Sequence, residues 1–306
     1  MKNSPAVSAV IPTRNRPHTI CRAVNSVLGQ TFQDLEVVVV LDGPDDATLD
    51  VLKSVTDSRL RVVVRPQSGG GATARNEGVQ QARGEWIAFL DDDDEWLADK
   101  LARQLEKAAQ KESGEPIVSS RFIARTAMGD HVWPGEMLRP GQPVSEYLLS
   151  REGIRRSDGF IITTTILARR SLLLRVPFTS GLKRHQDWDW VLRATSQPGV
   201  EVLFCPEPLA ICHMQDDNSV SRSTDWQFSW NWAREMKPFL TPRAYAAFLT
   251  CHVAWQAAAQ RAWGGFFPLL LDARRNGPVR ISDLLRYAGF WFVPRQLRRR
   301  LAARTN

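Results

Sequence analysis

The chain has 306 residues, of which 43% are hydrophobic and 24% are charged, a balance typical of a globular protein with a sizeable core. No run reaches the roughly 18 consecutive apolar residues of a membrane-spanning helix, and the amino terminus lacks the apolar core of a signal peptide. We therefore expect a cytoplasmic protein whose four cysteines are reduced thiols.

The positive charge of the chain is concentrated near its end. The formal net charge is +7, and residues 262–306 hold nine arginines, no lysine and only two acids, Asp272 and Asp283. The preceding 261 residues are neutral overall. This distribution argues against a general nucleic-acid binder and directs attention to the basic segment itself.

Four apolar runs in the first third of the chain predict β-strands. Their valines and isoleucines follow one another without polar alternation, which suits strands buried on both faces of a parallel sheet. Helical patterns lie between the runs, and Pro17 and either Asp45 or Asp46 are suitable helix starts. This alternation predicts right-handed β-α-β units in a doubly wound α/β sheet. The strands are expected at Val7–Thr13, Glu36–Asp42, Arg59–Arg65 and Glu85–Asp91, and the helices at Pro17–Leu28, Asp45–Val55 and Ala72–Ala82.

Polar residues follow the predicted strands, at the edge where doubly wound sheets bind their ligands. Thr13 and Arg14 follow the first strand, and Asp42 follows the second. Gly69–Gly71 follow the third strand and lead into a helix that bears Arg75. A glycine turn at a helix start can present backbone N–H groups to an anion. Its sequence "SGGGATARN" matches neither the dinucleotide nor the P-loop motif, so a plain flexible turn is an open alternative.

Five acids in a row, Asp91–Glu95, follow the fourth strand. Like charges repel, and their burial is costly unless a cation neutralises them. Carboxylates at a strand end can hold Mg²⁺ or Mn²⁺, which in turn bridges phosphate oxygens. The alternative is the acidic start of a helix over "DDEWLADKLARQLEKA", residues 93–108. We favour the ligand role for Asp91 and Asp93, and the helix start for Asp94 and Glu95.

The order of the motifs "VIPTRNR", "VVVVLDG", "ARNEG" and "GEWIAFLDDDDEW" resembles the nucleotide-sugar domain of glycosyltransferase family 2, with the GT-A fold. The resemblance is dense over residues 7–96 and returns at "HQDWDWVLRA" and "CHMQDDNSVSR". It implies that the D-x-D motif falls on Asp91, Asp92 and Asp93. Asp93 would bind Mg²⁺ or Mn²⁺, while Asp91 and Asp92 would contact the nucleotide sugar.

The same resemblance assigns the remaining site residues. His213 would lie near the metal and the diphosphate, and the general base would be Asp187, although Gln186 stands where the family usually has a second acid. Asp189 is the lesser candidate for the base, and a helix cap is the structural alternative for Asp187. The residues implied for the nucleotide are Pro12, Thr13, Arg14, Asp42 and Arg75.

These features together predict a Rossmann-like GT-A α/β fold, with a mostly parallel sheet flanked by helices, and a helical C-terminal extension. We expect a catalytic domain over 1–220, with a donor half over 1–115 and an acceptor half over 116–220, and a basic, aromatic region over 221–306. The implied reaction is inverting transfer of one sugar from a nucleotide diphosphate sugar, UDP being favoured, to a hydroxyl acceptor in cell-surface polysaccharide or glycolipid synthesis.

Other classes of protein stay open at this stage. A nucleotidyltransferase of similar fold would be expected to carry glycines near "VIPTRNRP", and they are missing. A non-catalytic nucleotide-sugar or glycan-binding module has no need of Asp91, Asp93, Asp187 and His213 together. The hypothesis of a nucleic-acid binder rests only on the arginine-rich segment, and we expect no nucleic-acid partner.

The C-terminal segment 262–306 combines its arginines with aromatic residues. Its apolar runs are too short to span a bilayer. Aromatics beside a basic face suit the interface of an anionic membrane, where the enzyme would meet a lipid-linked acceptor on the inner face of the plasma membrane. The alternative is a tail packed on the catalytic domain with solvated arginines. The aromatics are Phe266, Phe267, Tyr287, Phe290, Trp291 and Phe292.

Overall fold

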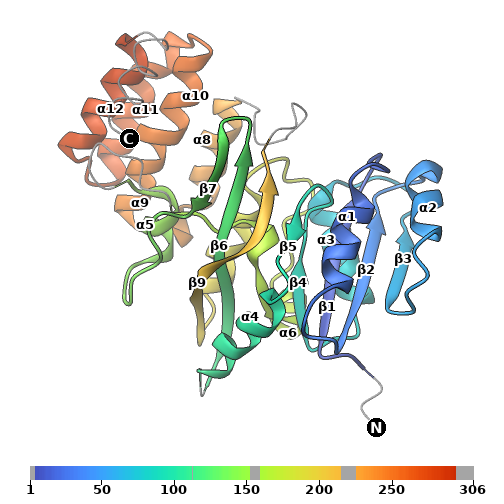
Figure 1. The fold of residues 1–306 in the computed structure, drawn as a ribbon. Helices are drawn as coiled ribbons and strands as arrows, with labels where there is room; N and C mark the ends of the chain where they lie inside the picture. The colour runs from blue at the N-terminus through green and yellow to red at the C-terminus, as the bar shows by residue number, and fades with distance from the viewer. Residues whose placement is uncertain (1–3, 112, 152–158, 215–224, 294–306) are drawn as a thin grey trace. The chain divides into compact units, whose positions relative to one another are not determined.

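The computed structural model describes residues 4–111, 113–151, 159–214 and 225–293 (Figure 1). The chain divides into two compact units. The first comprises Met1–Leu138 with Phe160–Asp217, and the second comprises Arg139–Gly159 with Asn218–Asn306. The predicted division at residue 220 stays a prediction.

The first unit is built on one sheet with the strand order β3-β2-β1-β4-β8-β6-β9-β5, to which β7 adds beside β6. The four strands β3, β2, β1 and β4 are parallel, whereas β8 is antiparallel to β4. The strands are β1 (Val7–Thr13), β2 (Leu35–Leu41), β3 (Leu60–Val64), β4 (Trp86–Phe89), β5 (Glu95–Trp96), β6 (Glu115–Thr126), β7 (Gly129–Trp133), β8 (Leu167–Arg169) and β9 (Val200–His213).

Helices of the first unit cover this sheet, with α1 and α3 packed on β1 and β2, and α4 packed on β6 and β9 (Figure 1). Every residue of β1 and β2 is buried, as expected for unbroken valine and isoleucine runs. Asp45 caps its helix as predicted, accepting a hydrogen bond from Thr48 N. The helices are α1 (Ile20–Leu28), α2 (Asp46–Lys53), α3 (Gly71–Gln81), α4 (Lys100–Ala109), the 3₁₀ turn η1 (Thr163–Thr165), α6 (Arg170–Arg175) and α7 (Gln186–Thr195).

The predicted helix over residues 93–108 is wrong in its first half. Helix α4 begins at Lys100, and Glu95–Trp96 form the short strand β5, which pairs antiparallel with β9. Trp96 is buried, its backbone N–H donates to Ser26 Oγ at 3.0 Å, and its indole N–H donates to the carbonyl of Thr164 at 3.1 Å. These long-range contacts outweigh the local helix preference of the sequence.

The second unit is helical. Its longest helical run, α9 (Pro242–Ala247), η4 (Phe248–Val253) and α10 (Ala254–Ala259), contains a π-helical turn at η4. Thr241 caps the run and Pro242 is its first residue, where proline is well tolerated. The other helices are α5 (Val144–Leu149), α8 (Trp226–Glu235), η3 (Lys237–Phe239), η5 (Trp263–Gly265), α11 (Phe266–Asn276) and α12 (Ile281–Phe292).

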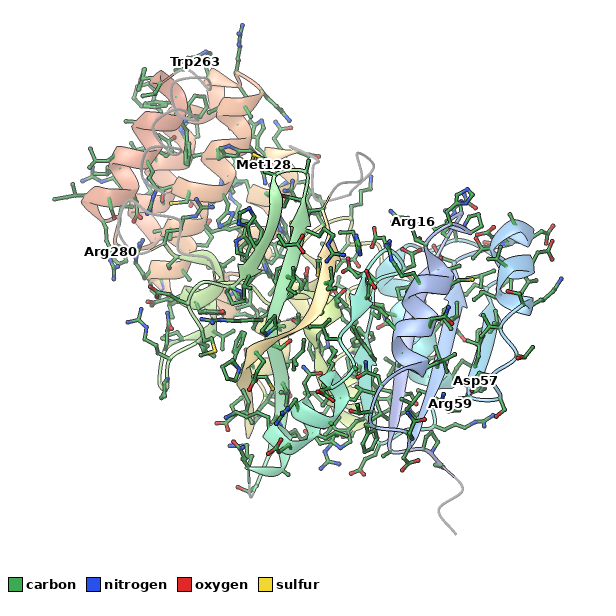
Figure 2. The ribbon with its side chains drawn as sticks, in the orientation of Figure 1. Arg16, Asp57, Arg59, Met128, Trp263 and Arg280 are labelled. Atoms are coloured by element: carbon green, nitrogen blue, oxygen red, sulfur yellow. The ribbon has the colours of Figure 1, made fainter. Side chains whose placement is uncertain are left out.

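The aromatic residues of α11 and α12 divide between core and surface. Tyr287 and Trp291, expected among the exposed aromatics, are buried instead. Trp263, Phe267 and Phe292 are exposed by 54%, 69% and 65%, and Figure 2 shows Trp263 at one end of the helical unit. Within the described part of the chain, no helix combines the length and apolar character needed to cross a bilayer.

Candidate active site

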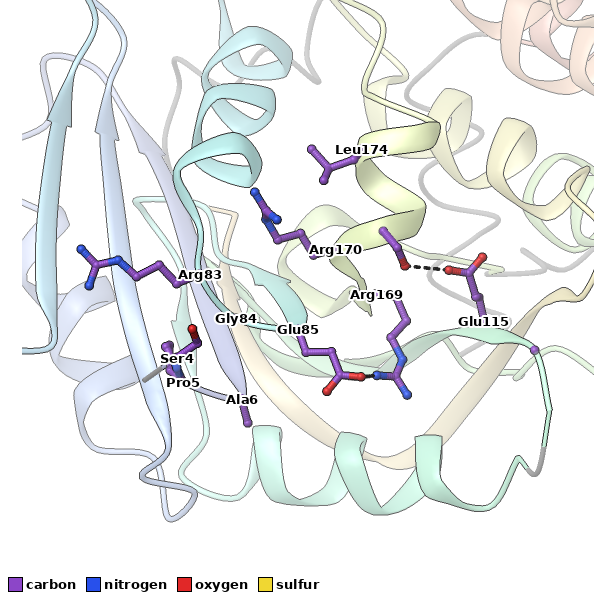
Figure 3. Close-up of a pocket in the computed structure, with 12 residues that line it drawn as sticks. Ser4, Pro5, Ala6, Arg83, Gly84, Glu85, Glu115, Arg169, Arg170 and Leu174 are labelled. Carbon is purple, nitrogen blue, oxygen red and sulfur yellow. Dashed lines mark hydrogen bonds and ion pairs between the residues drawn. The ribbon is translucent and has the colours of Figure 1, made fainter. Parts of the chain in front are cut away.

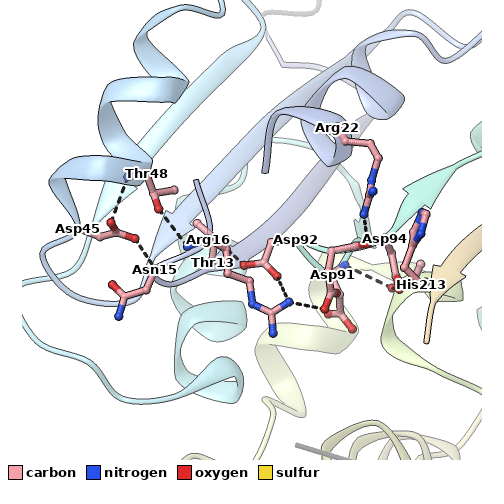
Figure 4. Close-up of polar contacts among 12 residues, drawn as sticks. Thr13, Asn15, Arg16, Arg22, Asp45, Thr48, Asp91, Asp92, Asp94 and His213 are labelled. Atoms are coloured by element: carbon pink, nitrogen blue, oxygen red, sulfur yellow. Dashed lines mark hydrogen bonds and ion pairs between the residues drawn. The ribbon is translucent and has the colours of Figure 1, made fainter. Parts of the chain in front are cut away.

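The carboxyl ends of β1 and β4 lie side by side, because these strands are parallel neighbours in register. Thr13 ends β1, and the acid cluster begins two residues after β4 ends. The two segments meet where Thr13 Oγ1 donates to Asp92 Oδ2 at 2.6 Å (Figure 4). The sheet therefore brings together residues that the sequence places 79 positions apart.

Alternate acids of the cluster lie in different environments. Asp92 and Asp94 are buried, whereas the side chains of Asp91 and Asp93 are 36% and 24% exposed. Burial raises the pKa of Asp92 and of Asp94 to about 7 in each case. Asp91 and Asp93 therefore present partly exposed carboxylate oxygens that a ligand can reach.

The buried acids hold the loop in place. Asp94 Oδ2 accepts from Thr164 Oγ1 at 2.7 Å, and its Oδ1 accepts from the backbone N–H of His213 at 3.1 Å. The imidazole Nε2 of His213 lies 2.7 Å from Glu95 Oε1. The prediction that His213 binds a metal stays a prediction.

Two arginines to which the sequence motifs assign no role, Arg16 and Arg22, contact Asp93. Arg16 forms an ion pair with Asp93 and lies 3.6 Å from Asp92 Oδ1. Arg22 donates to the backbone carbonyl of Asp93 at 2.5 Å. The only signal for them in the sequence is the acid cluster itself, since its charge demands nearby cations.

Arg75 links the acid cluster to the start of α7. Its Nη2 lies 2.5 Å from Asp91 Oδ1, and its Nη1 donates to Gln186 Oε1 at 2.8 Å. The neutral Gln186 can accept this bond without adding another negative charge beside Asp91. Arg75 therefore brings the predicted donor side and the predicted base together.

Asp187 lies in the first turn of α7, and the residue at the helix N-cap is His185, so Asp187 is not the cap. Burial raises the pKa of Asp187 to about 6, with the charge of Asp91 adding to this shift and Arg75 opposing it. Asp189, by contrast, accepts from Thr179 Oγ1 at 2.7 Å and pairs with Arg193 at 2.7 Å. Both of these partners of Asp189 are groups of the fold around this helix.

Asp42 binds the glycine turn. Its carboxylate accepts from the backbone N–H groups of Gly69 and Gly70 at 2.9 and 2.8 Å and from Ser68 Oγ at 2.7 Å, and it pairs with Arg65. Burial alone would raise the pKa of Asp42, but these bonds hold it below its usual value. The turn thus binds a carboxylate of the chain itself, and recognition of a base by Asp42 stays a prediction.

The remaining predicted residues line the same edge. Pro12 is buried in β1, and the exposed Arg14 donates to Ser68 Oγ. Their contact with a nucleotide stays a prediction.

The donor set fits a hard divalent cation. Asp91 and Asp93 present partly exposed carboxylates, and Mg²⁺ at nucleotide sites typically uses one or two carboxylates together with substrate phosphates. In the part of the chain that the structure describes, no group of three or more His, Cys, Asp or Glu side chains is arranged to hold a metal ion by itself.

A cavity of about 760 Å³ opens near the amino ends of β1 and β4, away from the acid cluster (Figure 3). Two of its three arginine side chains, those of Arg169 and Arg170, are engaged in the fold. Arg169 pairs with Glu85 and lies over the ring of Trp86 at 4.1 Å, and Arg170 Nε donates to the carbonyl of Val79 at 2.9 Å. The cavity does not include any of the predicted site residues.

Comparison with solved structures defines the class of the fold. TarS of S. aureus in complex with UDP-GlcNAc aligns with a TM-score of 0.59 and 18% identity over 95% of this chain and 91% of that one. The mannosyltransferase PcManGT of Pyrobaculum calidifontis, in complex with GDP-Man and Mn²⁺, aligns with a TM-score of 0.58 and 18% identity over 97% and 83%. The predicted GT-A class of α/β fold is confirmed.

Comparison of sequences defines the family. A model described as glycosyl transferase family 2 matches residues 8–176, more than half of the chain. The amylovoran biosynthesis glycosyltransferase AmsB of Erwinia amylovora is 32% identical over 77% of this chain and 79% of its own length. The putative teichuronic acid biosynthesis glycosyltransferase TuaG of Bacillus subtilis is 40% identical over 50% of this chain and 56% of its own length. The chain belongs to glycosyl transferase family 2, so the predicted family is confirmed.

Proposed function

We propose that this protein transfers one sugar from a nucleotide diphosphate sugar, with UDP as the favoured nucleotide, to an acceptor hydroxyl with inversion of configuration. One observation carries the proposal. The partly exposed carboxylates of Asp91 and Asp93 stand at the ligand edge of the sheet, and Arg75 connects Asp91 to Gln186 at the start of the helix that bears Asp187. The UDP-GlcNAc in the TarS complex supports the choice of nucleotide.

The donor would be held at the ends of β1, β2 and β4. Asp93 would bind Mg²⁺ or Mn²⁺, with His213 as a further ligand, and Asp91, Asp92 and Arg75 would contact the nucleotide sugar. When bound, the cation offsets the negative charge that develops on the diphosphate leaving group. The Mn²⁺ in the PcManGT complex supports this assignment.

Asp187 would act as the general base. It accepts the proton of the acceptor hydroxyl while the hydroxyl oxygen bonds to the anomeric carbon and the bond from that carbon to the diphosphate oxygen breaks. A pKa of about 6 leaves the carboxylate ionised at neutral pH and still basic enough to take a proton. A single displacement of this kind inverts the anomeric centre.

The acceptor would be a glycan or a lipid-linked glycan of a cell-surface polysaccharide. AmsB is named for amylovoran biosynthesis, and WfgD of Escherichia coli, 39% identical over 32% of this chain and 39% of its own length, is named as a glucosyltransferase that acts on a diphosphoundecaprenol-linked sugar.

Peripheral contact with an anionic membrane through residues 262–306 would bring the enzyme to such an acceptor. The exposed Trp263, Phe267 and Phe292 support this contact, and the rings of Trp263 and Phe292 lie 5.8 Å apart. Residues 294–306, which hold five of the nine arginines, lie outside the described residues.

The donor site is tested by calorimetry with UDP, with and without a chelator, on the wild type, Asp93→Ala and the control Asp50→Ala. Asp50 is an exposed acid of the first unit that pairs with Lys53. We expect metal-dependent binding by the wild type and the control, and its loss in Asp93→Ala. Equal UDP affinity with and without chelator would contradict the metal role.

The reaction is tested by incubating the protein with a panel of nucleotide sugars and acceptors and assigning the anomeric configuration of the product by NMR. We expect transfer with inversion. A product that retains the donor configuration would contradict the single displacement.

A further inference from the structure

Arg16 is a cation that the chain itself places on the proposed metal ligand. Its Nη1 pairs with Asp93 Oδ2 and lies 3.6 Å from Asp92 Oδ1 (Figure 4). The side chain of Arg16 is 30% exposed, so the ion pair lies at the mouth of the site and is open to solvent. A divalent cation on the same oxygen of Asp93 would compete directly with this guanidinium.

The backbone of Arg16 is fixed, although its side chain is long. The preceding residue, Asn15, has a left-handed φ of 53° and donates its backbone N–H to Asp45 Oδ2 at 2.6 Å. The N–H of Arg16 itself donates to Thr48 Oγ1 at 3.2 Å. These bonds tie the turn after β1 to the start of α2. A change of partner by Arg16 therefore requires only its side chain to move.

The charges at this edge make such a change favourable. Asp91, Asp92 and Asp93 follow one another, and removal of Arg16 from Asp93 without replacement would leave their repulsion uncompensated. A metal ion bound to a nucleoside diphosphate brings both the replacement cation and a new anion. A guanidinium is well suited to that anion, because its fork of N–H donors matches phosphate oxygens.

We propose that Arg16 is an internal counter-ion that the metal–nucleoside diphosphate complex displaces from Asp93, and that the displaced guanidinium then binds the diphosphate. The proposal rests on the proposed function, since it takes Asp93 as the metal ligand. Its consequence is positive coupling. Metal alone breaks the ion pair between Arg16 and Asp93, whereas metal with nucleotide replaces that ion pair with one between Arg16 and the diphosphate.

The test consists of two titrations of the full chain. In the first, Mn²⁺ is added alone and EPR measures the free ion. In the second, UDP is added at saturating Mn²⁺ and calorimetry measures binding. Arg16→Met keeps most of the apolar stem and removes the charge. We expect it to bind free Mn²⁺ about tenfold more tightly and UDP about tenfold more weakly, the scale of one charged hydrogen bond. Arg103→Met, which removes an exposed arginine of α4, is the matched control and should leave both affinities unchanged.

Arg16→Lys provides a second variant that keeps the charge and loses the fork. It should bind free Mn²⁺ as the wild type does and UDP more weakly. Free Mn²⁺ affinity in Arg16→Met equal to that of the wild type would overturn the counter-ion role. Tighter Mn²⁺ binding without weaker UDP binding would overturn the transfer of Arg16 to the diphosphate.

The same titration separates this proposal from the one on which it rests. If Asp93→Ala keeps Mn²⁺-dependent UDP binding, the proposed metal site is wrong. If Asp93→Ala loses that binding while Arg16→Met behaves as the wild type, the metal site stands and the counter-ion proposal alone fails.

Discussion

Asp283 of the helical unit and the successive aspartates 91–93 of the sheet unit differ in the hydrogen-bond donors around them. In the helical unit, the fully buried Asp283 accepts from both Nη1 and Nη2 of Arg243, at 2.6 and 3.2 Å, and from the backbone N–H of Arg280 at 3.0 Å. In the sheet unit, the successive aspartates 91–93 share Arg16 and Arg75. Asp283 thus has several hydrogen-bond donors of its own, whereas the aspartates 91–93 share two arginines.

This difference is expected if Asp283 stabilises the fold and the aspartates 91–93 bind a ligand, as we propose. Asp272 of the helical unit follows the first pattern, since it accepts from Trp230 Nε1 at 2.6 Å and from the hydroxyl of Tyr245 at 3.2 Å. At the sheet edge, Asp92 accepts from Thr13 Oγ1 and shares Arg16 with Asp93, and burial raises its pKa to about 7.

The largest expected effect concerns the helical unit. Asp283→Ala would leave Arg243 buried without its partner, which typically lowers the free energy of unfolding by about 3–5 kcal/mol. Urea titration of the full chain measures this change, with the exposed-pair variant Asp50→Ala as the control. A midpoint for Asp283→Ala equal to that of the control would show that the pair does not stabilise the fold.

The next effect concerns the base. Asp187→Asn keeps the shape of the side chain and removes its basicity, so transfer should fall by about 10²-fold or more while donor binding stays near that of the wild type. Steady-state transfer and UDP calorimetry measure the two quantities. Asp189→Asn is a poor substitute for this test because Asp189 binds Thr179 and Arg193. Transfer by Asp187→Asn at the wild-type rate would assign the base elsewhere.

A third effect is the dependence of transfer on pH. Burial raises the pKa of Asp187 to about 6, and the base acts only in its ionised form. Transfer measured as kcat/KM should therefore rise with pH through about 6 and fall roughly tenfold per pH unit below it. A rate that stays constant from pH 7 down to pH 5 would contradict the assignment of Asp187 as the base.

The smallest expected effect concerns the exposed aromatics of the helical unit. Phe267→Ser should weaken binding to anionic vesicles by roughly fivefold, since partial burial of a phenylalanine contributes about 1 kcal/mol. Co-sedimentation measures the bound fraction, and high salt should lower it further. Val132→Ser, which changes an exposed apolar residue of β7, is the control. Binding that is indifferent to Phe267 and to salt would argue against the membrane contact.

The sequence predicts best where local pattern decides the structure. Strand β1 begins and ends at the predicted residues, because its apolar run is buried on both faces. The helix cap at Asp45 depends on neighbouring residues, and it is found as predicted. The family could be predicted for the same reason, because the order of its motifs is visible in the sequence itself.

Prediction from the sequence fails where contacts between residues far apart in the chain determine the structure. The strand at Glu95–Trp96 replaces a predicted helix because Trp96 packs against residues about 70 positions away. The pairing of Arg16 with Asp93 joins residues 77 positions apart, so no local pattern marks it. The same holds for the bond from Arg75 to Gln186, which only the folded sheet brings together.

The central claim, that the acids at the sheet edge serve a ligand and those of the helical unit serve the fold, is tested most directly by comparing Asp93→Asn with Asp283→Asn. Each variant is measured for its free energy of unfolding and for UDP binding in the presence of Mn²⁺. We expect Asp93→Asn to lose UDP binding without loss of stability, and Asp283→Asn to lose stability while its folded fraction binds UDP as the wild type does. An Asp93→Asn variant that binds UDP normally and is as unstable as Asp283→Asn would contradict the account.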